Sequence, residues 1–277
     1  MKEQISSDRI ERADVSVIVP CYRCIDTIRR AVDSILAQTA LPQEIVLIDD
    51  FSDDGDLTIN ELKRLQQASV TVPIKLLCLL ENGGPGSARN AGWEIASQPY
   101  LAFLDADDSW HPKKLALQFQ WMLEHPGVVM SGHATLKRGL TDPIPDLVST
   151  LTAGPVNSYR LLFKNYFPTR SVMLKRELPY RFVPGKRYAE DLLLWLTIAL
   201  NGNSLWHLNL PLAYSYKEEF GDGGLTGDLW KAERGVQDTY FRLRNDKKIS
   251  LGLYFLASIF SLFKYARRWL ISKWRLV

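Results

Sequence analysis

The first half of the chain alternates short apolar runs with segments of helical spacing. Apolar runs rich in β-branched residues predict strands at Val15–Val19, Glu44–Ile48, Pro73–Leu80 and Tyr100–Leu104. Apolar residues three or four positions apart predict helices at Thr27–Gln38, Leu57–Gln67, Ala88–Ala96 and Pro112–Glu124. Strands that alternate with helices are typical of βαβ units, so we expect an α/β fold with a mainly parallel mixed sheet flanked by helices.

The second half of the chain gives weaker patterns. Further strands are expected at Val128–Met130 and Phe167–Leu174, on either side of a loop over residues 139–155. Leu192–Leu200 is almost wholly apolar and predicts a buried helix. Phe220–Gly227 is a glycine-rich loop, which either closes over a substrate or is a plain linker.

Two of the predicted strands end in carboxylates. Asp50 follows the second strand, and Asp105, Asp107 and Asp108 follow the fourth. Parallel strands bring their carboxyl ends to one edge of a sheet, where open α/β sheets bind ligands. Asp105 and Asp107 lie two apart and share a face, so their charges repel unless a cation lies between them; oxygen ligands favour Mg²⁺ or Mn²⁺. An acidic cap for the helix after Pro112 is the alternative, but a cap needs only one carboxylate.

Charge is unevenly distributed along the chain. The formal net charge is +3, yet residues 242–277 hold nine Lys and Arg against one acid, so residues 1–241 are net acidic. A net-acidic body argues against a nucleic-acid partner. Three cysteines make no disulfide framework and residues 1–13 contain no apolar signal core, so we expect a cytoplasmic protein with reduced cysteines.

The C-terminal segment, residues 249–277, combines apolar and basic side chains. Residues 249–263 are uncharged but fall short of the roughly 20 residues that span a bilayer. On a helix, one polar stripe would be formed by Ser258, Ser261, Lys264, Arg268, Ser272 and Arg275. We expect an interfacial helix that holds the protein peripherally on an anionic cytoplasmic membrane surface. A helix packed on the core or in an oligomer interface is the alternative.

Four motifs in a fixed order point to a family. They are Val15-Ser-Val-Ile-Val-Pro-Cys-Tyr22, Glu44-Ile-Val-Leu-Ile-Asp-Asp-Phe-Ser-Asp53, Asn82-Gly-Gly-Pro-Gly-Ser-Ala-Arg-Asn-Ala-Gly92 and Leu104-Asp-Ala-Asp-Asp108. Together they resemble the family-2 inverting glycosyltransferases, whose nucleotide-binding α/β sandwich is called GT-A. The resemblance covers residues 14–216. It implies a nucleotide-sugar half at 14–112 and an acceptor half at 113–216, ahead of a C-terminal segment at 217–277.

The resemblance implies a donor site at the strand ends. Tyr22 would stack on the nucleotide base, Asp50 would hydrogen-bond the base, and Arg89 would line the nucleotide pocket, with Pro20 beside them. The sequence departs from the family pattern at Arg23, where Asn is common, and at Phe51, where Gly is common. Both departures affect loop geometry and leave the carboxylates in place.

The resemblance also implies the chemistry. Asp105 and Ala106 would lie near the ribose, Asp107 would bind the metal, and Asp191 would be the catalytic base. A saccharide hydroxyl would then displace the diphosphate of a nucleotide sugar, with UDP expected as the nucleotide, in cell-surface polysaccharide synthesis. The basic tail favours a lipid-linked acceptor. The Glu190-Asp191 pair has a plainer explanation as well, because acids in a first helical turn are favoured by the helix dipole.

Three other interpretations compete with this one. Gly83-Gly-Pro-Gly86 suggests a Rossmann oxidoreductase, but the third glycine of that fingerprint falls on Arg89 and Pro85 lacks a backbone N–H. A nucleotide-sugar-binding protein without catalysis also fits the motifs. Cys21-x-x-Cys24 resembles a redox pair, yet its neighbours do not match, so both cysteines are expected to be structural.

Overall fold

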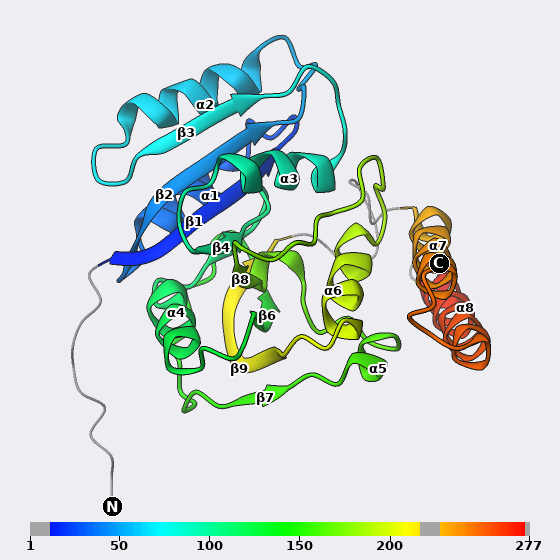
Figure 1. Ribbon diagram of the computed structural model, residues 1–277. Helices are drawn as coiled ribbons and strands as arrows, with labels where there is room; N and C mark the ends of the chain where they lie inside the picture. The colour runs from blue at the N-terminus through cyan, green and yellow to red at the C-terminus, as the bar shows by residue number, and fades with distance from the viewer. Residues whose placement is uncertain (1–11, 217–227, 275–277) are drawn as a thin grey trace, which may run out of the picture.

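The computed structural model describes residues 12–216 and 228–274, which form one mixed sheet covered by helices on both faces (Figure 1). The glycine-rich loop predicted at Phe220–Gly227 lies outside the described residues. The sheet is built from β1 (Arg12–Cys21), β2 (Leu41–Asp49), β3 (Ile74–Cys78), β4 (Tyr100–Phe103), β5 (Ser109–Trp110), β6 (Met130–Lys137), β7 (Ala153–Pro155), β8 (Met173–Lys175) and β9 (Leu205–Ser215).

The strand order is β3-β2-β1-β4-β8-β6-β9-β5, with β7 paired to β9. β1 pairs in parallel with β2 and β4, and β2 with β3, so these four strands point the same way. β8 runs antiparallel to both β4 and β6. The sheet therefore continues from the expected nucleotide half into the acceptor half without a break.

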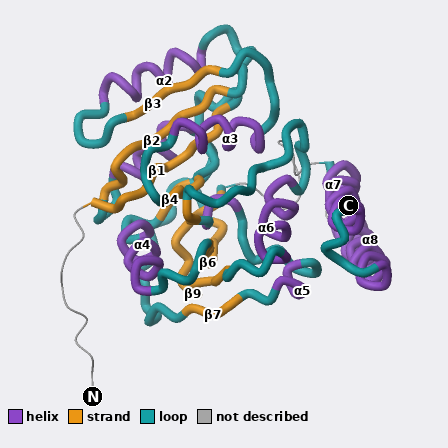
Figure 2. The backbone as a smooth tube through the Cα atoms, viewed as in Figure 1, coloured by secondary structure: helices purple, strands orange, loops and turns teal. Residues whose placement is uncertain are grey.

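Helices cover the sheet in two layers (Figures 1 and 2). Along β1, Val17 and Val19 face one core while Ile18 between them faces the other, because successive strand side chains point to opposite faces. The first core receives α1 (Ile28–Leu36), α2 (Leu57–Ala68) and α4 (Lys114–Glu124). The second receives α3 (Pro85–Ile95) and α6 (Glu190–Leu200), with short helical turns at α5 (Ser158–Leu161) and η1 (Thr169–Ser171).

The C-terminal part forms a helical hairpin outside α6. α7 (Leu229–Asn245) packs on α6, and α8 (Leu251–Trp274) packs on α7 (Figure 1). Gly235 in α7 makes this approach possible, because a Cβ at that position would lie 2.5 Å from the Cβ of Tyr188. Within the described residues, no helix is both long and apolar enough to cross a bilayer.

The structure confirms the α/β fold class and corrects several boundaries. α3 begins at Pro85, three residues earlier than expected, with the proline in its first turn. The strand predicted at Phe167–Leu174 is wrong in its first half, where η1 turns before β8 begins at Met173. The short strand expected at Val128–Met130 overlaps β6 only at Met130, where β6 begins before it runs on to Lys137.

Candidate active site

The carboxyl ends of β1, β2 and β4 bring the predicted donor residues to one edge of the sheet. Tyr22 directly follows β1 and is 43% exposed, and the Asp50 N–H donates to the Cys21 carbonyl at 2.8 Å. Pro20 lies within β1 opposite Ile48 of β2. Asp105 and the buried Ala106 come two and three residues after β4 ends. The structure thus places these residues together, as the parallel strand order requires.

Asp50 holds the glycine loop that precedes α3. Its two carboxylate oxygens accept the backbone N–H groups of Gly83 and Gly84 at 2.9 and 2.8 Å. Burial raises the pKa of Asp50, although these two amides act in the opposite direction. Gly84 has φ +82°, a left-handed conformation that favours glycine. The Asp50 carboxylate therefore fixes the loop that leads into α3.

The two departures from the family pattern occupy strained positions. Arg23 has φ 46° and Phe51 has φ 57°, so both lie in the left-handed region where Asn and Gly are favoured. Arg23 offsets its strain with a two-pronged ion pair to Asp53, in which Nε lies 2.5 Å from Oδ1. The Tyr22 hydroxyl also donates to Asp53 Oδ1, at 3.0 Å. Asp53 thereby holds the Tyr22 ring beside the strand ends.

Arg89 joins the two acidic motifs. Its Nη2 lies 2.7 Å from Asp105 Oδ1 and its Nη1 lies 2.9 Å from Glu190 Oε1. The side chain is 5% exposed. Burial alone would lower the pKa of Arg89, but the two carboxylates outweigh it and raise the pKa. The Arg89 bridge, defined as Asp105, Arg89 and Glu190, therefore ties the end of β4 to the start of α6.

A second contact from the same motif supports this bridge. The side chain of Asn90 pairs with both backbone groups of Phe182: its amide donates to the carbonyl at 2.8 Å and its oxygen accepts the N–H at 3.0 Å. This contact anchors the segment that leads to α6. Both polar residues of the Ala-Arg-Asn run thus hold the segment before α6 and α6 itself against α3 and the end of β4.

Glu190 and Asp191 form the first turn of α6. Ala189, directly before them, has φ 53°, an unfavourable left-handed conformation for alanine. The Thr239 hydroxyl of α7 donates to the Ala189 carbonyl at 3.4 Å. Burial raises the pKa of Glu190 to about 7, with the charge of Asp191 adding to the effect and Arg89 opposing it. α7 thus holds a strained turn that aims two acids at the site.

Asp191 is held by one backbone and one side-chain donor. Its Oδ1 accepts the N–H of Leu192 at 2.7 Å, and its Oδ2 accepts the amide of Asn165 at 3.2 Å. Burial raises the pKa of Asp191, while these two donors lower it. A carboxylate with a raised pKa and one fixed orientation is suited to accept a proton from a hydroxyl.

Asp107 and Asp108 are each approached by an arginine. Arg30 Nη2 donates to the backbone carbonyl of Asp107 at 2.7 Å, and Arg170 Nη1 lies 2.8 Å from Asp108 Oδ2. Burial raises the pKa of Asp108 to about 7, although Arg170 opposes it. Asp108 is therefore engaged within the protein by Arg170.

The donor set fits a metal that is shared with a substrate. Among residues 12–216 and 228–274, no group of three His, Cys, Asp or Glu side chains is placed to hold a metal. Mg²⁺ and Mn²⁺ are commonly held by one or two carboxylates together with substrate phosphates and water. Asp107, with Asp105 close to it in sequence, fits that pattern.

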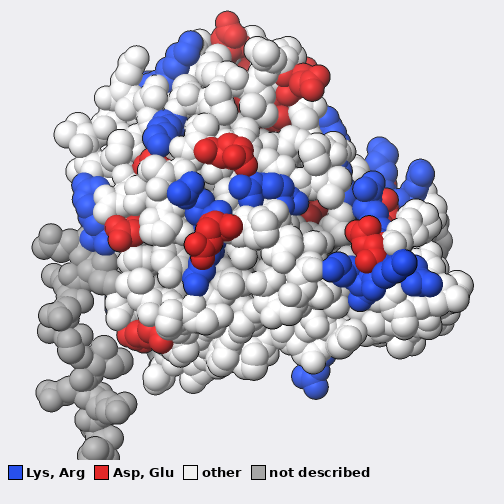
Figure 3. Space-filling view, in the orientation of Figure 1, with Lys and Arg blue, Asp and Glu red and all other residues white. Residues whose placement is uncertain are grey.

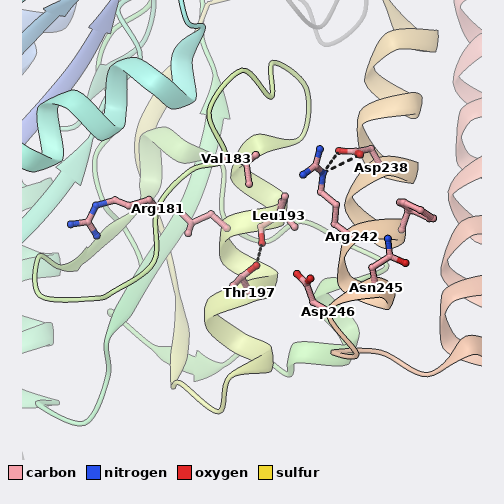
Figure 4. Close-up of a pocket in the computed structure, with 10 residues that line it drawn as sticks. Arg181, Val183, Leu193, Thr197, Asp238, Arg242, Asn245 and Asp246 are labelled. Carbon is pink, nitrogen blue, oxygen red and sulfur yellow. Dashed lines mark hydrogen bonds and ion pairs between the residues drawn. The ribbon is translucent and has the colours of Figure 1, made fainter.

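A cavity of the described protein lies away from these residues. It measures about 490 Å³ and lies between α6 and α7, with Leu193 and Thr197 on one side and Asp238, Arg242 and Asp246 on the other (Figure 4). Asp238 and Arg242 pair with each other at 2.9 Å. The cavity holds no residue of the acidic motifs, so its size does not locate the chemistry.

Several residues at the site were not predicted from the sequence. Asn165, Arg170 and Arg30 reach the acids from segments that carry no motif, and Glu190 was expected only as the neighbour of Asp191. Each of these contacts joins two residues that lie at least 26 positions apart in the sequence. No local pattern signals such contacts.

Comparisons with known proteins agree with this geometry. The model of the family described as glycosyl transferase family 2 matches residues 16–181. A putative teichuronic acid biosynthesis glycosyltransferase, TuaG of Bacillus subtilis (strain 168), is 29% identical over 256 residues, which cover 91% of this chain and 94% of TuaG. The Escherichia coli protein WfgD, named a UDP-Glc:α-D-GlcNAc-diphosphoundecaprenol β-1,3-glucosyltransferase, is 32% identical over 190 residues, covering 68% of this chain and 71% of WfgD.

Solved structures show the same fold. S. aureus TarS 1–349 in complex with UDP-GlcNAc superposes with a TM-score of 0.65 at 23% identity, covering 83% of this chain and 66% of that one. The mannosyltransferase PcManGT of Pyrobaculum calidifontis, in complex with GDP-Man and Mn²⁺, gives a TM-score of 0.66 at 20% identity, covering 95% and 75%. Together with the motifs at the strand ends, these matches establish that the chain belongs to glycosyl transferase family 2 and is a glycosyltransferase with the GT-A fold.

Proposed function

We propose that the protein transfers a sugar from a UDP-sugar to a hydroxyl of a lipid-linked saccharide, with inversion, in cell-surface polysaccharide synthesis. The observation that carries the proposal is the Arg89 bridge. It joins the strand-end acids expected to bind the donor to the helical turn that bears Asp191. A donor and a base in one site are what a single displacement requires.

The names of the relatives support the substrate classes. WfgD is named for UDP-Glc and for a diphosphoundecaprenol-linked acceptor, and TarS was solved with UDP-GlcNAc. TuaG is named for the synthesis of teichuronic acid. UDP-sugar and a lipid-linked saccharide are therefore the first substrates to test for this chain.

In the proposed reaction Asp191 acts as the general base. Its carboxylate accepts the proton of the acceptor hydroxyl while the hydroxyl oxygen bonds to the anomeric carbon. The bond from that carbon to the diphosphate breaks in the same step, and the electron pair leaves with UDP. A positioned base of this kind contributes roughly 10²–10⁴-fold. Leu192 N–H and Asn165 keep the base oriented.

The donor side of the site supplies recognition and charge. Tyr22, whose ring is half exposed, would stack on the base, Asp50 would hydrogen-bond the base, and Arg89 and Asp105 would border the ribose. Asp107 would hold Mn²⁺ or Mg²⁺, and such a cation offsets negative charge on a departing diphosphate. Asp105 stays oriented because Arg89 holds one of its oxygens.

The proposal includes a place of action. A lipid-linked acceptor is confined to a membrane, so a peripheral position on the cytoplasmic face fits the expected basic C-terminal segment. The apolar residues exposed on α8 support that position.

The deciding experiment is a transfer assay with UDP-, GDP- and dTDP-sugars and a short saccharide-diphosphate acceptor. Mn²⁺, Mg²⁺ and EDTA are compared for each donor. We expect UDP to be released only with a UDP-sugar and a divalent cation, and the anomeric configuration of the product to be inverted. Donor binding without turnover in every condition would instead mean a non-catalytic nucleotide-sugar-binding protein.

A further inference from the structure

Ser261, Lys264 and Arg268 of the predicted polar stripe contact the rest of the protein. Ser261, which is 1% exposed, donates its hydroxyl to Glu233 Oε2 of α7 at 3.0 Å, and Arg268 Nη2 lies 3.4 Å from the same oxygen. Gln237 donates to the other oxygen, Oε1, at 2.7 Å. Glu233 itself is fully buried. Removing these partners would leave a buried polar group unsatisfied, so the contacts hold this side of α8 against α7.

A cation expected to face a membrane is also used internally. Lys264 Nζ donates to the backbone carbonyl of Phe163 at 2.9 Å, and burial lowers the pKa of Lys264. With Arg268 paired to Glu233 of α7, two of the expected surface charges are used in contacts within the protein. Attraction to a membrane by this stripe is therefore weaker than the sequence suggests.

The opposite side of α8 is apolar and exposed. Phe255, Ile259 and Phe263 follow one another at four-residue spacing and are 53%, 52% and 72% exposed. We call these three residues the α8 outer row. The neighbouring Leu256 and Leu270 are 59% and 52% exposed. Soluble monomers rarely expose a continuous apolar strip of this kind, so a partner must cover it.

We infer that the α8 outer row inserts into the surface of a phospholipid bilayer, with binding carried by apolar burial more than by charge. α8 contains no acidic residue, so nothing on it repels an anionic headgroup. Arg267 is exposed and continues the outer row by one turn, where a long side chain can rest on lipid tails while its charge reaches the headgroups. A helix of 24 residues, about 36 Å long, fits the plane of the interface.

The same helix is connected to the proposed base. Lys264 holds the carbonyl of Phe163, the Phe163 ring lies 5.4 Å from that of Phe260, and Asn165 two residues later donates to Asp191. A bilayer on the outer face of α8 would thus lie against a helix that contacts the segment bearing Asn165. Figure 3 shows Lys and Arg side chains, with Asp and Glu among them, gathered where α7 lies. This part of the inference rests on the proposed lipid-linked acceptor.

The test replaces the α8 outer row by glutamine, which keeps helix propensity: Phe255→Gln, Ile259→Gln and Phe263→Gln together. The control carries Val70→Gln, Leu140→Gln and Val148→Gln, three exposed apolar residues in other places, which are 95%, 71% and 94% exposed. The purified full chain is floated with vesicles of phosphatidylethanolamine and phosphatidylglycerol at 0.1 M and 1 M NaCl. Urea unfolding and sedimentation are recorded for all three proteins.

We expect the wild type and the control to float and to lose no more than about threefold at 1 M salt, where screening leaves only about 3 Å of reach for charges. The outer-row variant should bind vesicles at least about tenfold more weakly at both salt concentrations, because it lacks the three apolar side chains that would be buried in the bilayer. Wild-type protein that stays with the soluble fraction, or that detaches fully at 1 M salt, overturns the inference. So does a wild-type dimer that becomes monomeric in the variant without vesicle binding, because a second copy then covers the row.

A soluble-acceptor assay separates this inference from the proposed function. Release of UDP with a short water-soluble acceptor should be equal in wild type and outer-row variant. If neither protein transfers sugar but the wild type floats, the proposed function fails while the bilayer surface stands. If both transfer sugar and neither floats, the proposed function stands and the inference of a bilayer surface fails.

Discussion

Arg89 Nη2 lies 2.7 Å from Asp105 Oδ1, inside a protein where that arginine is almost fully buried. The other nitrogen of the same guanidinium reaches Glu190, 101 positions further along the chain. One side chain therefore sets the separation between the end of β4 and the start of α6. The donor acids and the proposed base depend on each other through this contact.

The first prediction concerns the pH dependence of stability. The pKa of Glu190 is raised to about 7 in the folded chain, against about 4.3 when unfolded. Between these values the folded state holds a proton that the unfolded state releases, so this group's contribution to stability is lost as pH rises from about 4 to 7. Glu190→Gln has no carboxyl group at this position, so this contribution to stability should not change with pH.

Urea unfolding at pH 5 and at pH 8, without donor, checks this prediction. The unfolding free energy of Glu190→Gln minus that of wild type should be larger at pH 8 than at pH 5, by on the order of 1–3 kcal/mol. Exchange to glutamine keeps an acceptor for Arg89, so the fold should persist. Parallel stability curves for the two proteins would show that Glu190 is ionised throughout.

A second prediction isolates the metal. Asp107→Asn keeps the shape of the side chain and leaves the backbone carbonyl that Arg30 binds. Calorimetry should show UDP binding in Mn²⁺ weakened at least about tenfold, to the level that wild type shows in EDTA. Asp246→Asn, an exposed acid in the cap of α7, serves as the control and should bind as wild type. Equal binding by wild type in Mn²⁺ and in EDTA would remove the metal from the proposal.

A third prediction concerns the strained loop after β2. Phe51 has φ 57°, which costs a non-glycine residue about 1–2 kcal/mol. Glycine avoids this strain, but the greater freedom of its unfolded chain lowers stability by about 0.5–1 kcal/mol. Phe51→Gly should therefore leave stability unchanged or raise it by up to about 1 kcal/mol. Phe51→Ala loses the same ring but keeps the strain, so it should be the less stable of the two. Urea unfolding of both variants compares them directly, and a more stable alanine variant would contradict the strain argument.

Most of the first half of the fold follows from local pattern. β1, β2 and β4 are buried on both faces, so their apolar runs are continuous and easy to recognise. β9 gave no such signal, because its Trp206, His207 and Asn209 interrupt the apolar run. α7 was missed for a related reason: its charged sequence hides the buried Glu233 and Tyr240.

The site was predictable only where a motif stands at a strand end. Asp105 and Asp107 follow β4 directly, whereas Asn165 meets Asp191 through tertiary packing that no spacing encodes. The side of α8 that faces the protein could not be predicted either. Its amphipathic pattern is plain in the sequence, but which side faces inward is decided by Glu233 on another helix.

A fourth prediction tests the base. Asp191→Asn retains the acceptor oxygen for Leu192 N–H and cannot take up a proton at neutral pH. Turnover should fall by roughly 10²–10⁴ while the donor KM stays within about threefold. Steady-state kinetics with a soluble acceptor give both values. Equal losses in donor binding and turnover would make Asp191 a structural residue.

The last prediction separates the base from the residue that positions it. Asn165→Ala removes the amide that donates to Asp191 Oδ2 at 3.2 Å. That hydrogen bond lowers the pKa of Asp191 against the effect of burial, so its loss should raise the pKa further. A general base works in its ionised form, and the acidic limb of the kcat/KM profile should therefore move to higher pH. Activity should be lowered most at pH 6 and should recover as pH rises.

Asn157→Ala provides the matched control, because Asn157 caps α5 in the same segment by accepting the N–H groups of Tyr159 and Arg160. Loss of the cap should cost about 1 kcal/mol of stability and leave the pH profile where it is. A merely structural role for Asn165 would produce that same outcome: lower stability, lower activity at every pH and an unmoved acidic limb. If the acidic limb moves in Asn165→Ala but not in Asn157→Ala, the effect belongs to the Asp191 carboxylate. Both variants disturb the same loop, but only Asn165→Ala removes a contact to the base.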